Sequence, residues 1–208
     1  MSHSRRNRDR RPGRRPPFRD PKPIILVVCE GEKTEPQYLL GFVRACRNPR
    51  VRIEVAPEHG VPRTLVEIAK QHKIDAKAAA EREHDENLAF DSVWCVFDMD
   101  EHPNVGEARE MARDNGIELA VSNPCFELWL LLHFRESPGM QHRDKVQELL
   151  AGYVPDYDKR VDYATYSDGY LDATLRARRL DRVAASDGEE GRNPTTGVYR
   201  LTELIRGE

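Results

Sequence analysis

Three carboxylates stand where two of the most apolar segments of the chain end. The run 23–29 (PIILVVC) is followed by Glu30, and the run 91–97 (DSVWCVF) is followed by Asp98 and Asp100. A carboxylate is costly at the end of a buried strand unless water, a partner or a cation stabilises its charge. A metal or phosphoryl-transfer site is therefore one interpretation of these segments, and a solvated strand end is the other.

The spacing of Asp98 and Asp100 suits two carboxylates that bind one hard cation. In an extended backbone, residues i and i+2 point to the same side of the strand. Mg²⁺ prefers oxygen ligands and keeps several waters, so one or two carboxylates are enough to hold it. If the two apolar runs form neighbouring strands, Glu30 faces this pair. Carboxylates packed together raise the pKa of one of them unless a metal intervenes, and either state suits catalysis.

A further carboxylate, Glu127, lies within an apolar stretch (FELWLLL) that reads as a helix opened by Asn123 and Pro124. A carboxylate in a buried helix needs a partner or a metal. Glu127 is therefore predicted to face the same cation. Asn123 is predicted either to cap the helix or to contact the substrate.

Three basic side chains are predicted to contact a phosphate-containing substrate. Lys33 follows Glu30 in the same turn, where its ammonium group would meet a phosphate or pair with a glutamate. Arg63 and the N-terminal arginines would position a nucleic-acid backbone electrostatically. His102, just after the second aspartate, is the weakest of these candidates.

Two more glutamates, Glu32 and Glu35, follow Glu30 but do not directly end a buried strand. Thr34 is predicted to cap a helix whose first residue is Glu35. A negative charge in the first turn of a helix is favourable, so this carboxylate has a structural explanation. Glu32 stays undecided between these roles.

The apolar periodicity predicts strands that alternate with helices, which implies an α/β fold with a parallel sheet. In such sheets, ligands bind beyond the carboxyl ends of the strands. Glu30, Asp98 and Asn123 all follow or end predicted strands, so they should lie at one edge of the sheet. The predicted strands are 23–29, 51–56, 91–100 and 117–122.

Charge and composition divide the chain into three predicted parts. Residues 1–21 form an arginine-rich tail, with a charge of about +6 by count and little to bury, that should be disordered when free. It is predicted either to touch phosphates or to act only as a solubilising tail. Residues 22–135 form the α/β core, and residues 136–208 form a helical C-terminal part that packs on it.

Several classes of protein are excluded by what the sequence lacks. No apolar run is long enough to span a bilayer, and the basic N-terminus has no apolar stretch typical of a secretory signal. The four cysteines form no CxxC pair and no zinc-ligand spacing, which favours small core residues in a reducing cytoplasm. A phosphate-binding GxxxxGK[ST] loop is also absent.

Four segments in order resemble the RloB-like family over residues 22–205. They are CEGEKTEPQY, WCVFDMDEHPN, SNPCFELWLLLHF and NPTTGVYRL. The first two also resemble the Toprim fold of topoisomerases, DnaG-type primases and OLD-family nucleases. The resemblance implies an α/β fold with a Toprim-like four-stranded parallel sheet flanked by helices and a C-terminal helical extension.

The same resemblance implies a metal-dependent nuclease that uses Mg²⁺ or Mn²⁺. The position of Glu30 matches a glutamate that transfers protons and helps to hold metal, and Asp98 and Asp100 match the metal-binding aspartates. The DMD segment is followed by EHPN rather than by a third aspartate. Glu127 is the candidate that would replace this missing ligand.

RloB-like proteins accompany restriction and abortive-infection loci, often beside an ABC- or AAA-type ATPase. The resemblance therefore implies an anti-phage effector with a nucleic-acid substrate, DNA or RNA, and a separate ATPase partner. A non-catalytic metal-binding sensor or regulatory subunit of such a complex is the alternative, and nucleotidyl transfer ranks third. Homo-oligomerisation stays open.

Overall fold

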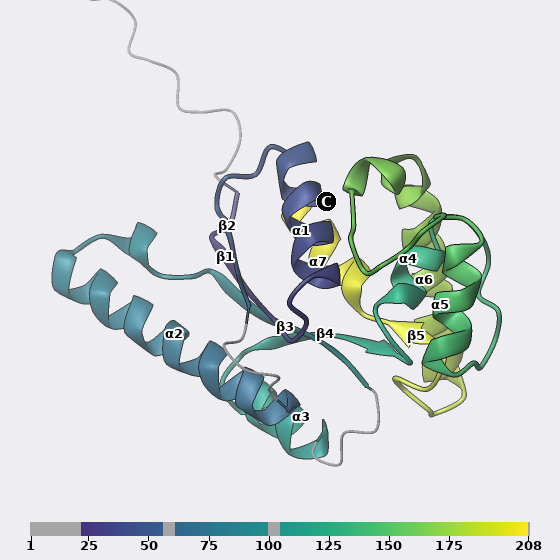
Figure 1. Cartoon of the computed structure of the whole chain (residues 1–208). Coiled ribbons are helices and arrows are strands. Elements are labelled where there is room, and N and C mark those ends of the chain that lie inside the picture. Colours follow the sequence, from purple (N-terminus) through teal and green to yellow (C-terminus); the bar gives the residue numbers. More distant parts are fainter. Residues whose placement is uncertain (1–21, 56–60, 100–104, 208) are drawn as a thin grey trace, which may run out of the picture.

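The computed structural model describes residues 22–55, 61–99 and 105–207. Its centre is a five-stranded sheet in the order β2-β1-β3-β4-β5 (Figure 1). The first four strands are mutually parallel and β5 is antiparallel to β4. The strands are β1 (Ile25–Cys29), β2 (Val51–Val55), β3 (Ser92–Asp98), β4 (Glu118–Asn123) and β5 (Thr195–Thr196).

The predicted four-stranded parallel sheet is confirmed, and the overall architecture is consistent with a Toprim-like fold. The additional strand β5 comes from the late NPTT segment, which apolar periodicity did not predict as a strand. Two residues are too few to show a strand period. The pairing places the hydroxyl oxygens of Ser122 and Thr196 2.9 Å apart inside the protein.

Alternating side chains of the central strands divide the core into two layers. Leu26 and Val28 face one cluster, which is covered by α2 (Pro62–Glu83) and α3 (Val105–Asp114). The opposite face of the sheet is covered by α1 (Thr34–Ala45) and α7 (Val198–Arg206), as Figure 1 shows. Both faces are buried, which explains why β1 reads as a continuous apolar run rather than an alternating one.

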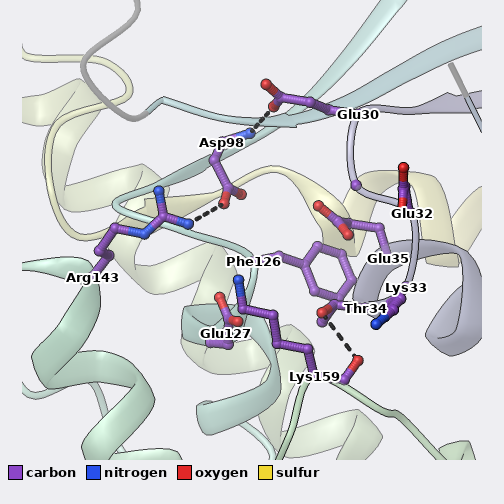
Figure 2. Close-up of a pocket in the computed structure, with 11 residues that line it drawn as sticks. Glu30, Glu32, Lys33, Thr34, Glu35, Asp98, Phe126, Glu127, Arg143 and Lys159 are labelled. Carbon is purple, nitrogen blue, oxygen red and sulfur yellow. Dashed lines mark hydrogen bonds and ion pairs between the residues drawn. The ribbon is translucent and has the colours of Figure 1, made fainter. Parts of the chain in front are cut away.

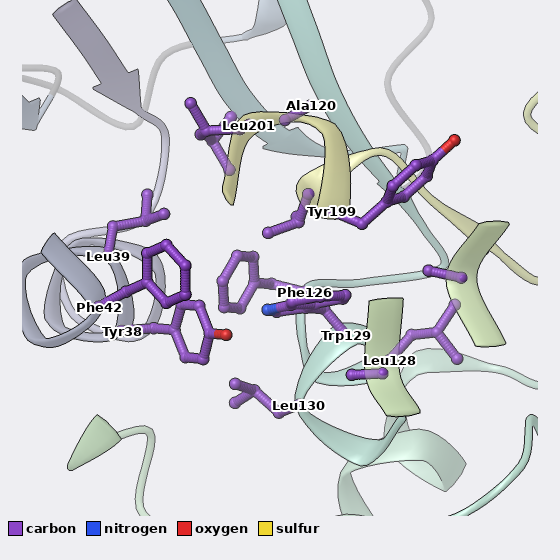
Figure 3. Close-up of a cluster of buried hydrophobic side chains, with 14 of the residues drawn as sticks. Tyr38, Leu39, Phe42, Ala120, Phe126, Leu128, Trp129, Leu130, Tyr199 and Leu201 are labelled. Atoms are coloured by element: carbon purple, nitrogen blue, oxygen red, sulfur yellow. The ribbon is translucent and has the colours of Figure 1, made fainter. Parts of the chain in front are cut away.

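A second group of helices extends the layer that contains α1. These helices pack around Trp129, which is fully buried and meets Tyr38 edge to face with ring centroids 6.1 Å apart (Figure 3). The group contains α4 (Glu127–Leu131), α5 (Arg143–Ala151) and α6 (Tyr170–Ser186), with short 3₁₀ turns at Tyr163–Thr165 and Ser167–Gly169. A further 3₁₀ turn, Glu86–Leu88, precedes β3. Residues after 135 thus supply both a peripheral helical group and two elements of the sheet layers, β5 and α7.

Two predicted helix starts are wrong. Asn123 does not cap a helix, because β4 continues through it by pairing with Thr195, and the helix of this segment, α4, begins only at Glu127. A residue before proline favours extended backbone, which agrees with this continuation. Thr34 is the first residue of α1 rather than its cap, and its hydroxyl donates to the carbonyl oxygen of Lys159 at 3.3 Å.

The strand order places a topological switch between β1 and β3. From β1 the chain first moves to β2 on one side and then to β3 on the other. Such a switch opens a crevice at the carboxyl ends of the two strands, where ligands of α/β proteins bind. Glu30 and Asp98 lie at this point, because the backbone amide of Glu30 still donates to the carbonyl of Val96 at 3.0 Å.

The cysteines are all reduced, and three of them are buried in the core, as predicted. Among the described residues, no helix has the length and apolar character to cross a membrane.

Candidate functional site

The carboxyl ends of β1 and β3, with the start of α1, form a cavity of about 290 Å³ that we call the acidic pocket (Figure 2). Five carboxylates and three cations line it. It is lined by Glu30, Gly31, Glu32, Lys33, Thr34, Glu35, Asp98, Phe126, Glu127, Arg143 and Lys159, of which Glu32 lies at the exposed rim.

Glu30 and Asp98 are brought together by the pairing of their strands. The backbone amide of Asp98 donates to Oε2 of Glu30 at 3.3 Å, so the glutamate side chain reaches across to the neighbouring strand (Figure 2). The prediction that Glu30 would face the DMD segment is therefore confirmed for its first aspartate. The second, Asp100, lies outside the described residues.

Asp98 is in an environment that disfavours its charge. Its side chain is 16% exposed, and its Oδ1 atom is buried with no hydrogen-bond partner among the described residues. Burial, together with the nearby carboxylates of Glu35, Glu127 and Glu30, raises the pKa of Asp98 well above its usual value. Arg143 opposes this shift from 4.0 Å, which is at the limit of an ion pair. A buried carboxylate held in this state is typical of a functional site.

Glu35 is the site residue that the sequence interpretation missed. It is only 6% exposed, and its carboxylate lies directly over Gly31, where a Cβ atom would sit 2.1 Å from Oε2. Burial and the charges of Glu127 and Glu30 raise its pKa to about 7, although Lys159 acts in the opposite direction. Side chains of a helix tilt towards its N-terminus, so a first-turn residue is directed back to the preceding strand end. This direction of first-turn side chains could have identified Glu35 as a pocket residue from the sequence.

Glu127 enters the pocket from the opposite side, at the first residue of α4. It is 4% exposed, and its Oε1 accepts hydrogen bonds from Gln147 at 3.1 Å and from the Tyr157 hydroxyl at 3.2 Å. The predicted need of this buried carboxylate for partners is therefore met by neutral donors. Glu127 in turn contributes to the raised pKa values of Asp98 and Glu35.

Three cations surround these carboxylates, and only Lys33 was identified from the sequence. Arg143 starts α5, and Lys159 lies in a loop with a φ of 68°, held by the hydroxyl of Thr34. Neither residue belongs to a motif around Glu30 or Asp98. Both come from segments far along the chain, so periodicity alone gave no signal for them.

The other predicted substrate contacts have different locations. Asn123 does not line the acidic pocket but lines a neighbouring cavity, which also contains Arg143. Arg63 lies away from both, where its guanidinium pairs with Glu67 at 3.1 Å and with Glu107 at 2.8 Å. His102 and the arginine-rich tail lie outside the described residues.

The donor chemistry of the acidic pocket fits a hard divalent cation. All of its acidic ligands are oxygens, and the unpartnered Oδ1 of Asp98 is the atom that most needs a positive partner. Within the described ranges, however, no three acidic, histidine or cysteine side chains are close enough to form a ligand set by themselves. Water, substrate oxygens or Asp100 would have to complete the coordination.

His133 fixes the two helices that carry Glu35 and Glu127. Its Nδ1 donates to the carbonyl of Trp129 at 2.9 Å, so its Nε2 accepts from the Tyr38 hydroxyl at 3.0 Å. This bond joins α1 to the end of α4 inside the core. The burial of His133 lowers its pKa to about 4.

This histidine should make the fold sensitive to acid. The pKa of His133 is lower in the folded state than in the unfolded state, so its contribution to stability is present above about pH 6.5 and is lost as the pH falls towards 4. The expected loss between pH 7 and pH 5 is about 2 kcal/mol. Urea unfolding of wild type and His133→Gln at both pH values measures it. A stability difference between the two proteins that does not change with pH would contradict the assignment.

Comparison with known proteins places the chain in a family. The family model described as RloB-like protein matches residues 25–205. The chain is also 26% identical over 185 residues to UvrABC system protein C of Desulforudis audaxviator (strain MP104C). The aligned region covers 89% of this chain. That alignment covers only 27% of the longer protein. No solved structure matches the chain significantly. With most of its length matched by one family model, and with the family's acidic segments gathered at one sheet edge, this chain belongs to the RloB-like family.

Proposed function

We propose that the protein is a Mg²⁺- or Mn²⁺-dependent nuclease that hydrolyses phosphodiester bonds at the acidic pocket. One observation carries this proposal. Asp98 has a buried oxygen without a partner at the switch point of the sheet, beside Glu30 and within reach of cations. Like charges are rarely packed around an unpaired carboxylate oxygen unless a bound cation compensates them.

Asp98 would hold the cation, with Glu30 and Glu127 as further ligands and Asp100 as the other expected one. Such an ion supplies a more acidic bound water and stabilises charge on a phosphate oxygen. Glu30 accepts a backbone hydrogen bond through Oε2, which orients its carboxylate at the strand end where it would take and return a proton.

Lys33, Arg143 and Lys159 would bind the phosphates on either side of the bond to be broken. The five carboxylates of the pocket outnumber its three cations, so the bound divalent ion would have to offset their charge before a polyanion enters. We also propose a role as an anti-phage effector with a separate ATPase partner. The sequence resemblance supports this role.

A cleavage assay with two matched variants tests this function. Full-length protein is incubated with labelled single-stranded and duplex DNA and RNA in Mg²⁺, Mn²⁺ or EDTA. Cleavage should require the divalent ion and fall at least about 100-fold in Glu30→Gln, because the proton carrier is lost. Glu32→Gln removes the same charge from the exposed rim of the pocket and should keep nearly wild-type activity. Cleavage that survives in Glu30→Gln would overturn the proposal.

One observation favours a second function, a non-catalytic metal-binding or regulatory subunit of an ATPase-containing complex. The described residues do not include three ligands already gathered around one point. A regulatory site would bind Mn²⁺ and change affinity for the ATPase without cleaving nucleic acid. Calorimetric Mn²⁺ binding with no cleavage by the reconstituted complex would support this function over the first.

A further inference from the structure

Strand β2 forms one edge of the sheet, and no described strand pairs with its outer side (Figure 1). The backbone amide of Ile25 in β1 donates to the carbonyl of Arg50 at 2.9 Å. Because successive residues of a strand direct their N–H and C=O groups to alternate sides, Val51 and Ile53 direct theirs to the outer side. No described residue bonds to them there. A free edge of this kind is a template for pairing with another strand.

The sequence of β2, VRIEV, is self-complementary when two copies run antiparallel. With Ile53 opposite Ile53, Arg52 of each copy lies opposite Glu54 of the other. These two positions form a non-hydrogen-bonded pair, in which opposed side chains are closest. Opposite charges at directly opposed positions stabilise strand pairing, and like charges oppose it. Parallel pairing in register would instead place like charges side by side.

The charges of β2 are already arranged to receive a second copy. Within one copy, the guanidinium of Arg52 pairs with Oε1 of Glu54, and Nε2 of His72 lies 2.9 Å from Oε2 of the same carboxylate. The side chain of Arg52 is nevertheless 61% exposed, so it has room for a second carboxylate. Two copies would form a square of alternating charges in which every neighbour has the opposite sign. Charges on an edge strand prevent pairing when they meet their own sign, and here they do not.

The apolar side chains of β2 are incompletely covered. Val51 and Ile53 pack against the core cluster that contains Leu39 of α1, yet both remain half-buried. A second copy beside β2 would remove more of their surface from water, which favours association.

We propose that two copies of the chain dimerise through β2, whose strands pair antiparallel about a two-fold axis at Ile53 and join the two sheets into one. The contact is isologous, because each copy contributes the same strand. A strand pair of five residues is a small interface, so the dimer is expected to be reversible. The acidic pockets lie at the carboxyl ends of β1 and β3, so they would open at opposite ends of the joined sheet. The dimer is therefore independent of the proposed nuclease function, and either proposal can fail alone.

The oligomeric state of the full-length protein tests this proposal. Sedimentation velocity from about 1 µM to about 200 µM spans the range in which small interfaces dissociate. The dimer fraction should rise with concentration. Arg52→Glu and Glu54→Arg should each raise the dissociation constant at least about 10-fold, because two symmetric opposite-charge pairs become like-charge pairs. Thermal unfolding of each variant checks that it is folded.

Mixing the two variants separates pairing between copies from the ion pair within one copy. Arg52→Glu is acidic at both positions and Glu54→Arg is basic at both, so neither pairs with itself but each complements the other. An equimolar mixture should therefore regain a dimer about as tight as that of wild type. The double variant Arg52→Glu/Glu54→Arg restores every pair and should also dimerise like wild type.

Arg82→Glu is the matched control, since it reverses a charge on an exposed side chain of α2 away from the edge strand. It should dimerise like wild type. A wild-type protein that stays monomeric over the whole range would overturn the proposal. So would a dimer that both single variants keep, or a mixture that dimerises no better than its components.

Discussion

Asp98→Asn is expected to abolish cleavage and, in the same protein, to raise its stability. The substitution keeps the size of the side chain but removes the charge that would hold a divalent cation. The cleavage rate should fall by about 100- to 1,000-fold, since a metal-binding carboxylate contributes several kcal/mol to the stabilisation of the transition state. Residual cleavage close to that of wild type would remove Asp98 from the site.

The thermal stability of Asp98→Asn should rise, because the charged carboxylate of Asp98 is destabilising in the folded wild type. Its Oδ1 has no described partner, and burial and neighbouring carboxylates raise its pKa. A carboxyl group with a raised folded-state pKa costs stability as the pH increases, and asparagine removes that cost. Thermal unfolding in EDTA should show a higher Tm for Asp98→Asn, by about 2–4 °C for each kcal/mol gained.

The pH dependence of this gain distinguishes its cause. The Tm difference should be larger at pH 8 than at pH 4, where the aspartate of the wild type is protonated more readily. Asp91→Asn is a poor control because its carboxylate accepts a backbone hydrogen bond from Ile24. Asp114→Asn at the exposed end of α3 is better and should leave both activity and Tm unchanged. A Tm that falls in Asp98→Asn would show that the charge is already compensated.

Gly169→Ala is expected to destabilise the fold strongly. A Cβ atom at this position would lie 2.2 Å from the carbonyl oxygen of His133 and 2.9 Å from its carbonyl carbon. Backbone atoms cannot rotate away as a side chain can, so α6 or the end of α4 has to shift. The expected loss is about 3 kcal/mol, at the upper end of overpacking effects. Urea denaturation at pH 7 measures it.

The reason for this effect is steric rather than conformational. The φ of Gly169 is −87° and its ψ is 0°, which alanine adopts readily. Gly106→Ala in the first turn of α3 is the matched control, since no described atom lies within 4 Å of the added methyl group. That variant should be unchanged or stabilised by up to about 1 kcal/mol. Equal stability of Gly169→Ala and wild type would refute the close packing between α6 and His133.

A disturbance at Gly169 should also reach the acidic pocket. His133 joins the helices that carry Glu35 and Glu127 through its bond to Tyr38. A displaced His133 would change the separation of these carboxylates, so the folded fraction of Gly169→Ala should cleave more slowly than wild type. Rates corrected for the folded fraction test this link between packing and function.

Local patterns in the sequence were enough to predict the parallel sheet and the strand ends that carry Glu30 and Asp98. Apolar runs and short polar breaks are local patterns, so they located the first four strands of the sheet. Parallel strands separated by helices then place Glu30 and Asp98 at one edge, and the structure confirms this arrangement. The ends of these two strands could be located to the residue because buried apolar residues are followed directly by a carboxylate.

The other side chains of the acidic pocket could not be predicted in this way, because tertiary packing brings them there. Glu35 is buried because Gly31 leaves space for its carboxylate, while Arg143 and Lys159 arrive from segments more distant in the chain. Arg63, predicted as a substrate contact, lies outside the acidic pocket and pairs with Glu67 and Glu107. These outcomes depend on how loops and helices pack against each other. Such packing sums many weak non-local contacts, and no local spacing of residues records it.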